Sequence, residues 1–202
     1  MALTLYNKKR NFRDTPEPSA GKAVKKNMFR FVVQRHDASR LHYDFRLELG
    51  GVLKSWAVPK GPSMNPADKR LAVMVEDHPV GYITFKGKIP AGNYGAGTVD
   101  IWDEGVFIPV DKDSIPITER QALTALKNGE LKFFLKGGVI EGGFVLVRLK
   151  KDEKNWLLIK HKDEYAVNKN YDSELIKKNT KKRSTAKKTP ARKTAKKTTA
   201  KK

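Results

Sequence analysis

The stretch from His36 to Glu48, HDASRLHYDFRLE, decides the fold because its residues alternate in character. Apolar side chains fall on one parity, at Leu41, Tyr43, Phe45, Leu47 and Leu49. Ionisable side chains fall on the other, at His42, Asp44, Arg46 and Glu48. A period of two predicts a β-strand, in which same-face neighbours lie roughly 6.6 Å apart. His42 and Asp44 can therefore converge on one cation while Arg46 reaches beyond it.

Working outward from this strand, short strand patterns separated by Gly and Pro turns recur along the chain. We expect further strands at residues 29–34, 52–58, 71–78, 98–102, 131–135, 143–149 and 155–161. A helix is indicated where Thr118 and Gln121 match a capping box and Gly129 can end the helix. Many short strands with one or two short helices predict a mainly β fold, an antiparallel barrel or sandwich, with the site inside it or at its mouth.

The composition divides the chain into three segments. Residues 1–28 form a lead-in, residues 29–168 a compact β domain, and residues 169–202 a basic tail. From residue 177 onward there are 13 Lys or Arg and no acidic or aromatic residue, so that 13 of the formal net charge of +20 belong to the tail and +7 to the rest. Such a segment has little to bury, and we expect it to be disordered. It predicts an electrostatic arm for a polyanion such as DNA, with a solubility tail as the alternative.

The sequence lacks the residues that some locations and chemistries require. There is no cysteine, so disulfides and thiolate metal sites are excluded. No stretch is long and apolar enough for a signal peptide core or a membrane span. We therefore expect a cytoplasmic, nucleoid-associated protein with no membrane partner.

Histidine is scarce, and three of the four histidines lie before residue 79 in strand-like segments. A lone histidine in a strand is typically a hydrogen-bonded structural residue. His36 and His42 lie six residues apart, and Asp44 follows two residues later, which favours a two-histidine, one-carboxylate metal site. Such a set suits Mn²⁺, Fe²⁺, Co²⁺ or Zn²⁺, and its spacing alone fits either an oxygenase or a hydrolase.

Cationic residues near these ligands favour phosphate chemistry. Arg40, Arg46, Lys60 and Arg70 surround the predicted ligands in sequence, and guanidinium groups match phosphate oxygens. Each cation taken singly is typical of a solvated surface charge. Together with a divalent metal they indicate phosphoryl transfer, with His78 as a general acid or a phosphate donor.

Two other features have structural interpretations. The glycines at 92, 95 and 97 lack the spacing of a Walker or Rossmann loop, so we expect only a tight connection between strands. Trp56, Trp102 and Trp156 lie in strand patterns, and we expect them in the core or at its rim.

Several long motifs resemble a known family. FVVQRHDASRLHYDFRLELGGVLKSWAVPKGPS, KRLAVMVEDHP, IPAGNYGAGTVDIWDEG and NWLLIKHKDEYA are similar to the 3′-phosphoesterase domain of bacterial and archaeal DNA ligase D. The likeness covers about residues 29 to 165, and RNFRDTPEP also resembles the family's N-terminal segment. The resemblance implies a compact β-barrel with a Mn²⁺-dependent site, Co²⁺ or Zn²⁺ being alternatives. It also implies a phosphodiesterase step on a 3′-terminal ribonucleotide and a phosphomonoesterase step on a 3′-phosphate.

The resemblance assigns roles residue by residue. It matches His36, His42 and Asp44 to metal ligands, and Arg46 and His78 to residues that contact the scissile phosphate. It matches Lys60 and Arg70 to side chains that serve chiefly the phosphomonoesterase step. Further site positions match Arg10, Glu17, Glu76 and Tyr82.

The partners implied are the 3′ ends of DNA, including a primer-template that ends in a ribonucleotide or a phosphate. Since 202 residues leave no room for ligase or polymerase domains, we expect a stand-alone member that works with Ku and with a separate ligase or polymerase. The alternative is a non-catalytic DNA-binding scaffold for end joining.

Overall fold

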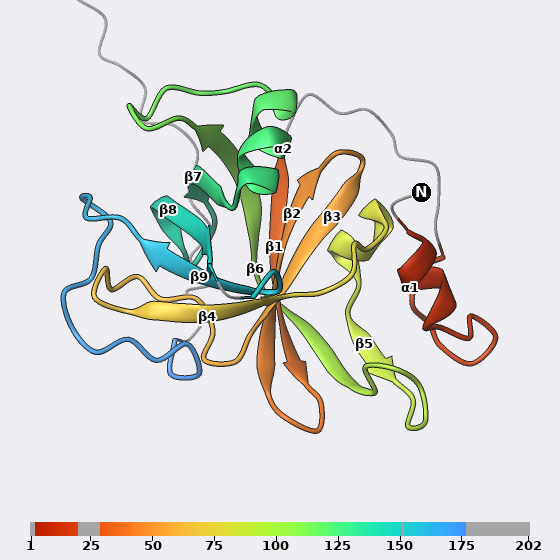
Figure 1. Cartoon of the computed structure of the whole chain (residues 1–202). Coiled ribbons are helices and arrows are strands. Elements are labelled where there is room, and N and C mark those ends of the chain that lie inside the picture. The colour runs from red at the N-terminus through yellow and green to blue at the C-terminus, as the bar shows by residue number, and fades with distance from the viewer. Residues whose placement is uncertain (1–2, 20–28, 151, 177–202) are drawn as a thin grey trace, which may run out of the picture.

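The chain folds into a closed antiparallel β-barrel, as the computed structural model shows for residues 3–19, 29–150 and 152–176 (Figure 1). Eight strands follow one another around the barrel in the order β1 (Arg30–Asp37), β2 (His42–Leu49), β3 (Val52–Val58), β4 (Lys69–Met74), β9 (Asn155–Lys160), β8 (Glu141–Arg148), β7 (Glu130–Lys136) and β6 (Gly97–Val110). Pairing of β1 with β6 closes the ring, and β5 (Gly87–Ile89) pairs with β6 beside it. The predicted mainly β barrel is confirmed.

Short helices accompany the barrel: α1 (Thr4–Lys8), the 3₁₀ helix η1 (Val80–Thr84) and α2 (Glu119–Asn128). The predicted capping box of α2 is present, because Thr118 and Gln121 each accept a backbone N–H of the other. Gly129 ends the helix with φ of 94°, a left-handed conformation that favours glycine. In the described part of the chain, no helix is long and apolar enough to cross a membrane.

The two faces of β2 meet different surroundings. The apolar side chains of β2, including Tyr43, Phe45 and Leu47, face the interior and pack in a core to which all eight barrel strands contribute. The three tryptophans are buried in the same core, as expected: Trp56, Trp102 and Trp156. A second apolar cluster covers the other face of the wall and consists of Tyr6, Val32, Leu53, Tyr82 and Ile83. Because aromatic side chains fill the interior, the ionisable face of β2 points outward under the lead-in and η1. The expectation of a site inside the barrel is therefore wrong, and the site lies on the outer face of the wall near one end of the barrel.

Several strand boundaries differ from those expected, most clearly in β4 and β6, and β1 continues to Asp37 past the expected end at residue 34. β4 ends at Met74. The chain then stays beside β3 through a hydrogen bond of 3.0 Å from the Val75 N–H to the Ser55 carbonyl and a bridge in which Leu53 and His78 exchange backbone hydrogen bonds of 2.8 and 3.0 Å. Within β4, Ala72 faces the core and is buried, whereas Leu71 is 41% exposed. β6 continues past the expected end at residue 102 because its first part pairs with β1 and its last part with β7.

The chain continues to pack on the barrel after residue 168, the expected end of the β domain. Tyr171 and Ser173 are buried, and Trp102 Nε1 donates a hydrogen bond of 3.3 Å to the Ser173 carbonyl. We call residues 169–176 the C-terminal strap. The basic residues of the expected tail, from 177 onward, lie outside the described residues, as do residues 20–28 of the lead-in.

Candidate metal and phosphate site

The predicted metal ligands come together where β1 ends and β2 begins. His36 and His42 are cross-strand partners, and Asp44 lies two residues further along β2 on the same face. Asp44 Oδ2 is 3.4 Å from His36 Nδ1, and Asp44 Oδ1 is 3.6 Å from His42 Nε2. The three ligand atoms lie within 4.8 Å of one another. A single ion can therefore contact all three side chains.

Backbone carbonyls orient both imidazoles toward that point. His36 Nε2–H donates to the Gly95 carbonyl at 2.9 Å, and His42 Nδ1–H donates to the Arg40 carbonyl at 2.9 Å. The other nitrogen of each ring is left as a lone-pair donor facing Asp44. Metal-binding histidines commonly have this second hydrogen bond, which fixes the tautomer. The donor set thus fits a divalent ion.

Arg46 places a buried positive charge beside the ligands. Its Nη2 donates to Asp44 Oδ2 at 3.0 Å and its Nε to Gln34 Oε1 at 2.7 Å. The residue is 2% exposed, and Nη1 is buried with no hydrogen-bond partner among the described residues. Burial raises the pKa of Asp44, but the charge of the Arg46 guanidinium opposes this effect, and the pKa lies below its ordinary value overall. An unpartnered guanidinium N–H at this point is suited to an anionic ligand.

His78 faces the site from the segment after β4. Its Nδ1–H donates to the Glu76 carbonyl at 2.8 Å, and its Nε2 accepts from Arg10 Nη2 at 3.1 Å. Burial, together with the guanidiniums of Arg46 and Arg10, lowers the pKa of His78 well below its ordinary value. His78 is therefore a neutral imidazole in this arrangement.

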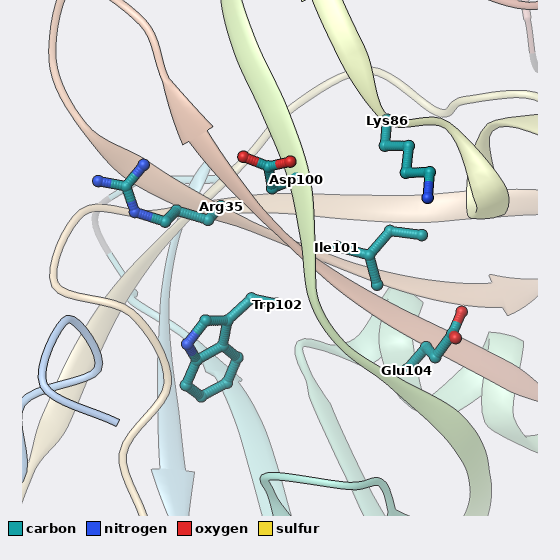
Figure 2. Close-up of a pocket in the computed structure, with 6 residues that line it drawn as sticks. All are labelled: Arg35, Lys86, Asp100, Ile101, Trp102 and Glu104. Carbon is teal, nitrogen blue, oxygen red and sulfur yellow. The ribbon is translucent and has the colours of Figure 1, made fainter. Parts of the chain in front are cut away.

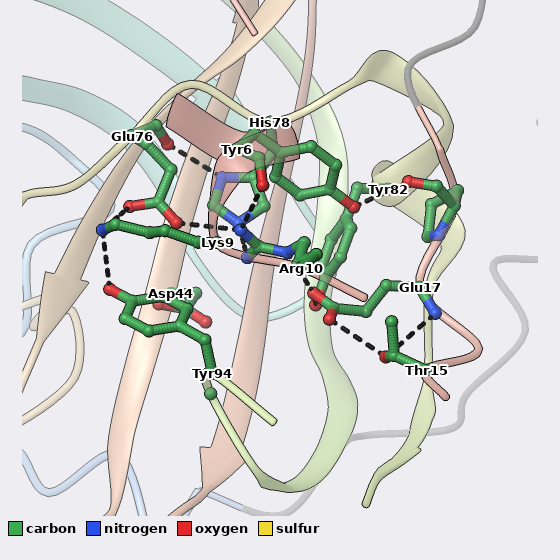
Figure 3. Close-up of polar contacts among 12 residues, drawn as sticks. Tyr6, Lys9, Arg10, Thr15, Glu17, Asp44, Glu76, His78, Tyr82 and Tyr94 are labelled. Atoms are coloured by element: carbon green, nitrogen blue, oxygen red, sulfur yellow. Dashed lines mark hydrogen bonds and ion pairs between the residues drawn. The ribbon is translucent and has the colours of Figure 1, made fainter. Parts of the chain in front are cut away.

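The lead-in supplies a network of charges over the site (Figure 3). Arg10 Nε donates to Glu17 at 2.8 Å, and Arg10 Nη1 donates to Glu76 at 3.0 Å. The Tyr82 hydroxyl donates a hydrogen bond of 3.0 Å to Glu17. Burial opposes ionisation of Glu76, but hydrogen bonds from Lys9 and Arg10 lower its pKa overall. The lead-in is thus a structural part of the site.

A cavity of about 310 Å³ joins these groups. The predicted residues that line it are Arg10, Glu17, His36, His42, Asp44, Arg46, Glu76, His78 and Tyr82. Lys60 and Arg70 do not line it. Lys60 is exposed, and Arg70 Nη2 donates to Asp68 at 2.9 Å and to the Tyr171 carbonyl at 2.6 Å.

Sequence reasoning missed three contributors to the site. Gln34 is fully buried and links Arg46 to the Tyr82 and Phe85 carbonyls, and its signal was a polar residue at the end of an apolar strand. Lys9 pairs with Glu76 at 2.9 Å, but a lysine in a basic lead-in carries no distinguishing signal. The 92–97 loop is the expected strand connection, and it also brings Tyr94 and Gly95 to the cavity wall.

Figure 2 shows a second hollow, of about 500 Å³, along β6. Its lining residues are Arg35, Lys86, Asp100, Ile101, Trp102 and Glu104. None of the predicted site residues lies there. The smaller cavity is therefore the candidate site.

Comparison with known proteins identifies the family of the chain. Residues 34–148 match the DNA Ligase D 3′-phosphoesterase domain, and the chain belongs to this family. It is 51% identical over 168 residues to the multifunctional non-homologous end joining protein LigD of Pseudomonas aeruginosa, and 42% identical over 163 residues to that of Mycolicibacterium smegmatis. These matches cover 81% and 80% of this chain but only 19% and 21% of the relatives, so the chain spans about a fifth of their length.

Proposed function

We propose that the chain is a metal-dependent hydrolase that repairs the 3′ ends of broken DNA strands. The observation that carries the proposal is the ligand set of His36, His42 and Asp44, in which His36 and Asp44 are buried, beside Arg46, whose Nη1 has no partner among the described residues. A cation-binding group and an unsatisfied anion-binding group meet in one cavity. A phosphate ester bound to a divalent ion satisfies both.

His36, His42 and Asp44 would hold the ion, with Mn²⁺ proposed and Co²⁺ or Zn²⁺ as alternatives. A bound divalent ion acts as a Lewis acid on phosphoryl oxygens and makes water more acidic. Arg46 would bind a non-bridging phosphate oxygen through Nη1 and stabilise the negative charge of the transition state. Its bonds to Asp44 and Gln34 hold the guanidinium in place for that contact.

His78 has to gain a proton to act on phosphate, because Nε2 is an acceptor in the observed arrangement. A phosphate group in the cavity adds negative charge beside the ring, which favours the imidazolium. It also offers Arg10 another acceptor, which releases Nε2. Protonated His78 could then donate to the leaving oxygen or bind the phosphate, and the proposal includes both roles.

The substrates proposed are a DNA strand ending in a 3′ ribonucleotide, cleaved by a phosphodiesterase step, and a strand ending in a 3′-phosphate, cleaved by a phosphomonoesterase step. The family membership supports this assignment. The phosphodiesterase step leaves a 3′-phosphate, and the phosphomonoesterase step then removes that phosphate to give a 3′ hydroxyl that a ligase or polymerase can use. We propose Ku and a separate ligase or polymerase as partners, in the cytoplasm near the nucleoid.

Phosphate release from a 3′-phosphorylated DNA strand tests the proposal directly. We expect release with Mn²⁺, no release with a chelator, and no release from the same strand phosphorylated at its 5′ end. His161→Ala is a matched control, because this histidine lies outside the cavity. If Mn²⁺, Co²⁺ and Zn²⁺ all failed to support release from the 3′ end, the proposed activity would be rejected.

A further inference from the structure

The candidate cavity has an inner side and a solvent side with different chemistry. Asp44 and Arg46 line it from within and are buried. Two hairpin loops, residues 38–41 and 90–96, extend from the same end of the barrel and contribute exposed lining residues, among them Ser39 and Tyr94 (Figure 1). Tyr94 is 48% exposed, whereas Tyr82 is buried. A ligand that extends from the phosphate site toward solvent therefore meets the ring of Tyr94.

The metal ligands and Tyr94 are joined through one residue of the loop. Gly95, the next residue, accepts the hydrogen bond from His36 Nε2 at 2.9 Å. Gly95 has φ of 76°, which favours glycine and fixes the turn at this point. The position of the Tyr94 ring is thus tied to the position of a metal ligand.

Tyr94 makes contacts that are unlike those of a core aromatic residue. Lys9 Nζ donates a hydrogen bond of 3.1 Å to its hydroxyl, drawn as a dashed line in Figure 3. The same nitrogen lies 4.3 Å from the ring centroid. The Arg10 guanidinium lies 5.6 Å from the same centroid. Within the described residues, Tyr94 belongs to neither apolar cluster. An exposed aromatic ring flanked by cations is the combination that binds single-stranded nucleic acid through base stacking.

We propose that Tyr94 is a substrate-positioning residue that stacks on the terminal nucleobase of the strand whose 3′ end enters the cavity. The phosphate then lies at Arg46 and the base lies on the Tyr94 ring, with Lys9 holding the ring in place. This inference rests on the proposed function, because it requires a nucleotide 3′ end as the ligand. Stacking of one base changes affinity by about 5- to 100-fold.

Two 3′-phosphorylated strands test the inference, one ending in an ordinary nucleotide and the other in an abasic residue. On the ordinary strand, Tyr94→Leu should raise KM about 5- to 100-fold with little change in kcat. Tyr94→Phe keeps the aromatic ring, so its KM should be close to that of the unaltered protein. On the abasic strand, Tyr94→Leu should have the same KM as the unaltered protein, because there is no base to stack on the ring. Tyr165→Leu is the matched control, since Tyr165 is also exposed but lies outside the cavity.

Equal losses on both strands would overturn the inference, because they would show that Tyr94 only helps to build the loop. Unchanged KM on both strands would overturn it as well. Hydrolysis of the abasic strand by the unaltered protein tests the proposed function separately. If that hydrolysis failed, metal-free binding of the two strands would still decide the role of Tyr94 through the same comparison of Tyr94→Leu with Tyr94→Phe.

Discussion

Three histidines of the site each have one ring nitrogen bonded to a backbone carbonyl. His36 donates to Gly95, His42 to Arg40 and His78 to Glu76. In each case the peptide backbone selects the tautomer and leaves the other nitrogen as an acceptor inside the cavity. The first two rings direct that nitrogen at Asp44, whereas His78 directs it at Arg10. This difference fits the two roles that we propose for these histidines, metal binding for His36 and His42 and proton transfer for His78.

Removal of one imidazole tests the metal assignment. His42→Ala should lower Mn²⁺ affinity and both hydrolytic activities at least about 100-fold, since loss of even an outer-shell partner commonly costs 10- to 100-fold. The barrel should stay folded because His42 is only partly buried. Calorimetric titration with Mn²⁺ and thermal unfolding separate the two effects. Normal 3′ processing by His42→Ala would show that the metal assignment is wrong.

The arrangement of the three guanidinium nitrogens of Arg46 gives a second prediction. A lysine has one nitrogen and cannot bond Asp44, Gln34 and phosphate in the same arrangement. Arg46→Lys should therefore reduce kcat about 100- to 1000-fold, in the range found for loss of a preorganised donor. It should also lower stability by about 1–3 kcal/mol, because Gln34 Oε1 is left buried without its donor. Steady-state kinetics and urea unfolding measure these effects, and near-normal kcat would contradict the proposed phosphate contact.

We predict that Lys60 and Arg70, the two cations outside the cavity, serve chiefly the phosphomonoesterase step. A terminal phosphomonoester carries more negative charge than a diester, so a distant cation should matter more to the monoesterase step. Lys60→Ala should reduce monoesterase kcat/KM about 10-fold or more while leaving the diesterase value nearly unchanged. Lys60 is the better probe, because Arg70 also donates to Tyr171 in the strap. Equal losses on the two substrates would refute the division.

At the scale of elements, the C-terminal strap connects the barrel end to the strands that bear the metal ligands. Glu174 accepts hydrogen bonds from Tyr43 and from Arg35, which are cross-strand partners next to the His36–His42 pair. The Ser173 hydroxyl donates to the Pro62 carbonyl at 2.7 Å. The strap therefore holds β1, β2 and the 59–63 loop together on the interior side of the wall.

The strap should make stability depend on pH. Hydrogen bonds from Arg35 and Tyr43 lower the pKa of Glu174 below its ordinary value of 4.5. The charged form is favoured in the folded state, so this contribution is complete above about pH 4.5 and disappears as pH falls through the lowered pKa. Glu174→Gln should reduce the Tm by a few degrees at most at pH 7, since the carboxylate is partly exposed. The difference from the unaltered protein should shrink toward pH 3.

Thermal unfolding from pH 3 to 8 gives this comparison. Glu153→Gln serves as the control because Glu153 is exposed on the surface. A Tm difference that stayed constant across this range would mean that the Glu174 charge does not contribute. If Glu153→Gln changed the Tm as much as Glu174→Gln does, the change would be an effect of net charge and not of the Glu174 hydrogen bonds.

Local patterns predicted those elements whose partners lie nearby in the sequence. The alternation in β2 and the capping box of α2 are complete within a few residues, and both are present. The outward position of the site could not be predicted, because it depends on packing of Tyr6 against Val32 and Leu53 from distant segments. Helix α1 has no side-chain cap, so its sequence carries no start signal. The length of β6 was not predicted, because Gly105 and Pro109 are residues that usually interrupt a strand. The strand continues past them because its first part pairs with β1 and its last part with β7.

The same distinction applies to the site. His36, His42 and Asp44 are close in sequence, and the hairpin of β1 and β2 brings them together as expected. Lys9 and Tyr94 were missed because 85 residues separate them, and only the closed barrel with its covering lead-in makes them neighbours. Polar contacts of this range have no periodic signature in a single sequence.

At the scale of the whole molecule, charge is distributed unequally along the chain. The 13 basic residues after residue 176 follow the strap, which is bonded to β1 and β2 next to His36 and His42. Basic residues bind the DNA backbone by releasing counterions, which makes affinity depend steeply on salt. We therefore predict that residues 177–202 bind DNA next to the end being processed and take no part in the chemical step.

Deletion of residues 177–202 should flatten the slope of log affinity against log salt. If half of the 13 charges contact phosphates, the slope should decrease by about 5, since each contact contributes about 0.7 to 0.9. KM should rise at moderate salt while kcat at saturating DNA stays unchanged, because the cavity residues all lie before residue 96. A variant with the same tail residues in scrambled order should behave like the unaltered protein, because counterion release depends on charge and not on order. An unchanged salt slope after deletion would exclude the tail from DNA binding, and a lower kcat would show that it helps to build the site.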